Sequence, residues 1–140
     1  MEVYINAENL IVGRMASYAA KKALLGNNIK ILNCEKAVIT GNRKDILGKY
    51  TQRRQMGNPS NGPFISRMPD RFVRRAIRGM LPYKKARGKE ALQRIMCYIG
   101  VPGEFKEKKM ITLPSADISK TRSLRFLNVK EICSNMGGKT

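Results

Sequence analysis

A strand–helix–strand pattern opens the chain and restricts its fold more than any other feature. Val3–Asn6 and Ile29–Leu32 are rich in residues that favour β-strands. Val12–Leu25, between them, places alanine and methionine side chains on one helical face, and the following Gly26-Asn27-Asn28 is typical of a helix end. A strand, a helix and a strand within about 30 residues form a βαβ unit with parallel, adjacent strands. The sequence therefore predicts an α/β fold.

Two amphipathic helices are expected in the middle of the chain. Pro69 suits a first helical turn and Asp70 suits its positive end, so a helix is predicted from Pro69 to Leu81. Its apolar side, expected to lie in the core, is formed by Phe72, Val73, Ala76, Ile77 and Met80. A basic connector follows over residues 84–89, and then a second helix up to Tyr98 is predicted. The inward-facing residues of that helix are Ala91, Leu92, Ile95, Met96 and Ile99.

Shorter signals predict three more elements. Ala37–Thr40 and Leu124–Leu127 are short apolar runs that we expect to form strands. Asn128, followed three residues later by Glu131, has the spacing of a helix cap and predicts a helix over Val129–Met136.

The segment between Arg43 and Met68 shows no periodicity. From Gly57 to Pro63 it consists of turn-forming residues, and arginines flank that run on both sides. Long irregular segments inside a compact domain are uncommon and are often functional. We expect a single domain over residues 1–140 with a basic loop at about 43–68, ordered by a partner; the alternative is a disordered surface loop.

Positive charge is concentrated in the middle of the chain. The sequence has 28 Lys and Arg against 10 Asp and Glu, and its net charge is +18. Fifteen of these bases but only three of the acids fall between Asn42 and Arg94, which gives that segment a net charge of +12. Such a segment repels itself unless a polyanion neutralises it, and arginine pairs with phosphate through two parallel hydrogen bonds. Nucleic acid is therefore the expected partner.

The candidate RNA-binding residues are the basic side chains of the predicted loop, of the first amphipathic helix and of the connector: Arg43, Lys44, Arg53, Arg54, Arg67, Arg71, Arg74, Arg75, Arg78, Lys84, Lys85, Arg87 and Lys89. A charged helix face is often only solvated, but here almost no acids are available to pair with these bases. Because aromatic residues make up only 6% of the chain, contacts to the backbone and grooves of folded RNA are favoured over extensive base stacking. Gly79 and Gly88 are expected either to permit a close backbone approach or positive φ, or to be plain turn glycines.

Enzymatic and cofactor-binding functions find little support. The chain has no histidine, the commonest general base and metal ligand. Gly13 stands alone where a dinucleotide fingerprint needs three glycines, and Gly41 is too far from Gly48-Lys49 for a phosphate-binding loop. We expect no cofactor, metal, catalytic residue or small-molecule substrate. An RNA-modifying or nucleotide-using enzyme is the main alternative, and a DNA-binding protein is another, although no helix-turn-helix pattern is visible.

The cysteines and the apolar runs restrict the class of protein further. Cys34, Cys97 and Cys133 are too widely separated for a zinc site and odd in number, so they are expected to be reduced and mostly buried. No apolar run approaches the about 20 residues that span a bilayer. A cytosolic protein without a membrane partner is expected.

Three stretches of the sequence carry family signatures. The most specific is Arg71–Pro82, whose core is Arg78-Gly79-Met80-Leu81-Pro82 and which continues through a basic turn to Gly88. Ile11–Ser17 and Leu32–Asn42 are the other two stretches. In this order and spacing they resemble the ribosomal protein L13 family (universal family uL13) over about residues 3–100. The start at the first strand and the basic connector look like the archaeal form.

The resemblance implies a three-layer α/β/α fold with a four-stranded parallel sheet, although the residues alone give neither the strand number nor their order. It also implies a non-enzymatic, structural component of the large ribosomal subunit in the cytoplasm. The implied partners are large-subunit rRNA and neighbouring large-subunit ribosomal proteins. The implied role is to bind that rRNA and to support subunit assembly.

Overall fold

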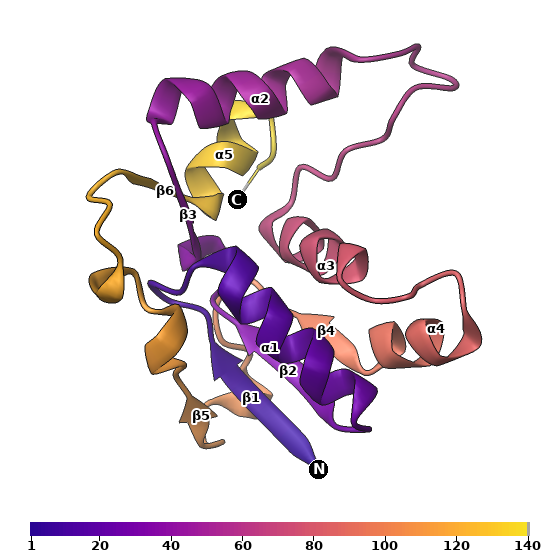
Figure 1. Ribbon diagram of the computed structural model, residues 1–140, viewed down its shortest axis with the longest axis vertical. Coiled ribbons are helices and arrows are strands. Elements are labelled where there is room, and N and C mark those ends of the chain that lie inside the picture. Colours follow the sequence, from indigo (N-terminus) through magenta and orange to yellow (C-terminus); the bar gives the residue numbers. More distant parts are fainter. Residues whose placement is uncertain (140) are drawn as a thin grey trace.

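The computed structural model describes residues 1–139 and contains a parallel sheet in the lower half of the molecule as drawn in Figure 1. Strands β1 (Glu2–Asn6), β2 (Asn28–Leu32), β4 (Ile95–Cys97) and β5 (Met110–Ile111) are arranged in the order β4-β2-β1-β5, and each neighbouring pair is parallel. Helix α1 (Val12–Leu24) connects β1 to β2. The predicted βαβ unit and the four-stranded parallel sheet are both confirmed.

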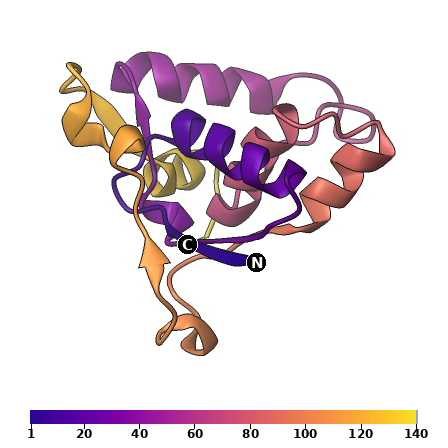
Figure 2. The same ribbon diagram turned by 60° about the horizontal axis from the view of Figure 1, so that its bottom comes forward.

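The two faces of the sheet are covered differently. Alternate residues such as Ile5, Ile29 and Ile31 pack with α1, α3 (Pro69–Gly79) and α4 (Ala86–Gln93) in the main core. The opposite face carries Tyr4 and Leu32, which pack against Phe105 in a short 3-10 turn. The sheet therefore lies between a layer of α-helices and a thin, turn-rich layer (Figure 2).

The prediction of an irregular loop was wrong for residues 43–55, which form helix α2 (Arg43–Gln55). Only Ile46, Leu47 and Tyr50 turn an apolar surface toward the core, so the sequence shows no continuous helical stripe. Asp45 in the first turn and two arginines in the last turn match the helix dipole. The helix lies over α5 (Val129–Asn135), and residues 56–68 form the irregular segment that follows it (Figure 1).

The predicted second amphipathic helix was too long and began too late. Helix α4 already starts inside the expected connector, at Ala86, and ends at Gln93, after which Ile95–Cys97 forms strand β4. The apolar residues of β4 are compatible with a strand as well as with a helix, and their pairing with β2 decides for the strand. Met96 and Ile99 are consequently exposed rather than inward-facing. Met80, just past the end of α3, is also 45% exposed rather than in the core.

The last third of the chain adds a second, smaller sheet. Strand β3 (Val38–Thr40) pairs antiparallel with β6 (Phe126–Asn128), close to the two positions where strands are predicted. Asn128 does precede helix α5, but its side chain makes no capping hydrogen bond. The predicted core side of α3 is otherwise confirmed, because Phe72, Val73 and Ile77 are buried.

Candidate nucleic-acid interface

The thirteen predicted binding residues lie on consecutive elements from α2 to α4. Four are on α2, one is in the irregular segment, four are on α3, and the last four lie in the turn before α4 and at its start. All are exposed except Arg74 and Arg78, which are half-buried. We call these thirteen side chains the basic surface.

Acidic partners are almost absent from the basic surface. Within residues 1–139, four ion pairs are formed, and Arg43 is the one member of the basic surface that takes part. Its Nη1 lies 2.8 Å from Oε2 of Glu131 on α5. Among the described residues, the other twelve side chains of this surface form no ion pair, so their positive charge is not compensated within residues 1–139.

Arg74 makes two side-chain hydrogen bonds within the fold. Its Nε donates a hydrogen bond to the Ile95 carbonyl at 3.2 Å and its Nη2 donates to the Leu92 carbonyl at 3.1 Å. The guanidinium thus satisfies backbone groups where α4 passes into β4. Arg94 acts similarly on α1 by donating to the Ala23 carbonyl. These two bonds give Arg74 a structural role, and they leave fewer of its donors free for a phosphate.

Two arginines are held against tyrosine rings. The guanidinium of Arg78 lies 4.8 Å from the centre of the Tyr83 ring, and that of Arg53 lies 5.6 Å from the centre of the Tyr50 ring. Stacking on a ring restricts a long side chain while leaving its hydrogen-bond donors free. Guanidiniums held in this way keep donors that could bind an anion in bidentate fashion.

Arg54 and Arg67 come together although thirteen positions separate them in the sequence. A Cβ added to Gly137, which has a positive φ, would lie 3.3 Å from Arg54 Nη1 and 3.6 Å from Arg67 Nη1. Both guanidiniums thus lie at the C-terminal end of α5, where the helix dipole favours cations. The fold therefore places the positive charges of Arg54 and Arg67 close to each other.

Gly79 and Gly88, the two glycines expected to have a special backbone role, differ in their surroundings. The close backbone approach expected at Gly88 is present, since a Cβ there would lie 2.1 Å from the Pro82 carbonyl oxygen. Gly79 has neither a positive φ nor a neighbour near its Cβ position. It ends α3 beside an open groove instead.

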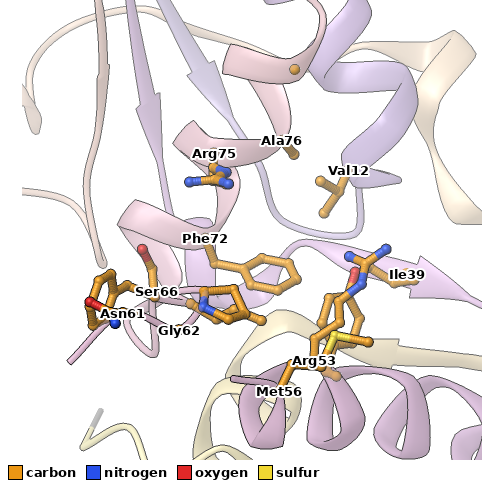
Figure 3. A pocket seen from close by; sticks show the side chains of 15 residues that line it. Val12, Ile39, Arg53, Met56, Asn61, Gly62, Ser66, Phe72, Arg75 and Ala76 are labelled. Carbon is orange, nitrogen blue, oxygen red and sulfur yellow. The ribbon is translucent and has the colours of Figure 1, made fainter. Parts of the chain in front are cut away.

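That groove, with a volume of about 810 Å³, lies between α2, the irregular segment and α3 (Figure 3). Its wall is largely apolar and includes Tyr50 and Phe72, whose rings meet edge to face at 5.2 Å between centroids. Burial raises the pKa of the Tyr50 hydroxyl above its usual range. Arg53 and Arg75 contribute the charges of the groove, and no acid is found among the described residues that line it.

The cysteines offer no reactive thiol. All three are free and buried. The neighbouring Cys97 and burial both raise the pKa of the Cys34 thiol, and burial raises that of Cys133 to about 12. Across residues 1–139, no cluster of metal-binding side chains is found, and no helix has the length and apolar character needed to cross a membrane.

Sequence reasoning missed two residues of this region. Lys49 is exposed on α2 one turn before Arg53. That the two residues share a helix face becomes visible only once the segment is recognised as a helix. Phe64 is 72% exposed and lies on the wall of the groove. No periodic signal marks Phe64, although a large aromatic residue inside a turn-rich basic segment is itself unusual.

Comparisons with known proteins decide the family. The profile of the family described as ribosomal protein L13 matches residues 1–104. The chain belongs to the ribosomal protein L13 family. A protein of Methanosarcina barkeri called large ribosomal subunit protein uL13 is 44% identical over 136 residues, which cover 96% of this chain and 97% of that protein. The protein of the same name from Methanococcus maripaludis is 45% identical over 141 residues, covering 98% of both chains.

Membership of the L13 family argues against the main alternative, an RNA-modifying or nucleotide-using enzyme. This is a family of structural ribosomal proteins, so the expectation that the chain is not an enzyme is confirmed. The related protein of Methanopyrus kandleri, 41% identical over 135 residues, is likewise archaeal, which agrees with the archaeal-type resemblance. The family match also covers α2, α3 and α4, which carry the basic surface.

Proposed function

We propose that this chain is a structural component of the large ribosomal subunit that binds large-subunit rRNA through the basic surface and supports subunit assembly. The observation that carries the proposal is the uncompensated positive charge on α2, α3 and α4 of an L13-family protein. The proposed contacts are the candidate residues other than Arg74, together with Lys49. Neighbouring large-subunit proteins are the proposed protein partners.

The mechanism follows from how these side chains are held. Helix α3 packs into the main core with its buried side, and α2 lies over α5 as a second basic helix (Figure 1). Phosphates bound on both helices would bring separate RNA segments together, against the repulsion between their backbones. Release of condensed counterions supplies much of the free energy of such binding. The protein thereby stabilises an RNA fold without chemical change.

Phosphate contacts make the affinity strongly dependent on salt. If about six to ten phosphates are neutralised, log K should fall against log salt concentration with a slope of about −4 to −9. The measurement is a titration of full-length large-subunit rRNA of the same organism with the full chain at several salt concentrations. A slope near zero, or no binding at low salt, would contradict the proposed function.

A further inference from the structure

The groove beside α3 has features that phosphate neutralisation alone does not explain. Phe64 is 72% exposed on its wall, although burying an aromatic ring would ordinarily stabilise the fold. The apolar wall is accompanied by Arg53 and Arg75, which Figure 3 shows on different sides of the Phe72 ring. The described lining residues include two cations, the polar Asn61 and Ser66, and no acid, and this combination matches a ligand that is flat, aromatic and attached to negative charges.

The segment that carries Phe64 is built to hold a shape. A Cβ at Gly57 would lie 2.6 Å from Gly62 Cα, and a Cβ at Gly62 would lie 2.4 Å from the Asn58 carbonyl oxygen. The Gly62 amide also donates a hydrogen bond to that oxygen at 2.6 Å. The two glycines therefore close a tight turn that only residues without side chains can form. Pro63 follows directly and further restricts the backbone before Phe64.

We propose that the groove receives an unpaired base of the rRNA, stacked on Phe64, with the adjoining phosphates bound by Arg53 and Arg75. The inference rests on the proposed rRNA binding and adds a specific nucleotide contact to it. Unpaired bases of folded RNA are the ones that proteins stack on aromatic side chains. Arg53 already lies against the Tyr50 ring, so its charge is fixed on one side of the groove. The absence of acids among the lining residues favours a nucleotide over a basic protein tail.

Three substitutions of Phe64 separate stacking from simple apolar contact. Phe64→Ala and Phe64→Leu should weaken binding to large-subunit rRNA about 5- to 150-fold, the loss expected for one stacked base. Phe64→Tyr keeps the aromatic face and should keep wild-type affinity. Leu124→Ala is the control, because Leu124 is 92% exposed and lies outside the groove. Full retention of affinity by Phe64→Leu would show that no base is stacked there.

A photocrosslink identifies the occupant directly. The full chain with benzoylphenylalanine in place of Phe64 is irradiated on protein-free rRNA and in reconstituted large subunits. We expect a crosslink to one unpaired nucleotide in both samples. A crosslink only to base-paired RNA, or only to a ribosomal protein, would overturn the inference. If wild-type chain binds rRNA while every Phe64 variant binds equally well, only this inference fails; if wild-type chain does not bind rRNA, the proposed function fails as well.

Discussion

Replacement of Arg71, Arg75 and Arg78 together by Gln should abolish most rRNA binding while leaving the protein folded. The three residues are spaced at i, i+4 and i+7 on α3, away from its buried side. Each charge-assisted hydrogen bond contributes about 1.5–3 kcal/mol, so affinity should fall by about a thousandfold or more. Exposed charges such as Arg71 and Arg75 add little to stability, and the stacking of the half-buried Arg78 on Tyr83 contributes about 0.5–1 kcal/mol. The unfolding free energy from thermal melts should therefore fall by less than about 2 kcal/mol.

A matched variant separates local contact from loss of net charge. Lys106, Lys108 and Lys109 are exposed near β5, at the opposite end of the molecule from α2 (Figure 2). Their joint replacement by Gln removes the same three charges, but long-range attraction is screened beyond about 10 Å at ordinary salt. This control should bind rRNA nearly as well as wild type. Equal losses in the two triple variants, or unfolding of the α3 variant, would contradict the assignment.

Phe72→Ala should cost about 3–5 kcal/mol of unfolding free energy, because the ring is 9% exposed and its removal leaves a cavity. Such a loss is a large part of the stability of an ordinary domain. The ring also meets Tyr50 edge to face, so the variant should weaken the attachment of α2 to the rest of the fold. Denaturant unfolding monitored by circular dichroism measures the difference.

Phe64→Ala is the control for that substitution, since it removes the same ring from a position that is 72% exposed. It should change the unfolding free energy by no more than about 0.5 kcal/mol. If Phe72→Ala cost less than about 1 kcal/mol, the ring would contribute far less than its burial indicates.

The elements that could be predicted are those whose signals are local. The β1–α1–β2 unit was found because each of its elements carries its own periodicity and a clear stop at Gly26. Helix α2 was missed because its contacts are with residues distant in the sequence, first of all the packing of Tyr50 against Phe72. Asn135 Nδ2 donates to Thr51 Oγ1 at 3.2 Å from 84 residues away, and Glu131 pairs with Arg43. No window of the sequence contains both partners.

The arrangement of the basic surface was only partly predictable for the same reason. Charge density identifies the segment, but it does not reveal that Arg74 is used by the fold or that Arg54 and Arg67 converge beside Gly137. The boundary between α4 and β4 shows a second difficulty. The apolar residues from Ile95 onward are compatible with both helical and strand periodicity, and only their pairing with β2 shows that they form a strand. The groove combines residues from Val12 to Gly79 and has no signature in any single segment.

Cosedimentation with large ribosomal subunits tests the central claim most directly. The full chain, tagged and expressed in its own organism, should migrate with the large subunit in a density gradient and stay there after a wash at elevated salt. The Arg71, Arg75 and Arg78 triple variant should be largely lost from that fraction in the same wash. Wild-type chain that remains at the top of the gradient, apart from the large subunit, would contradict the account.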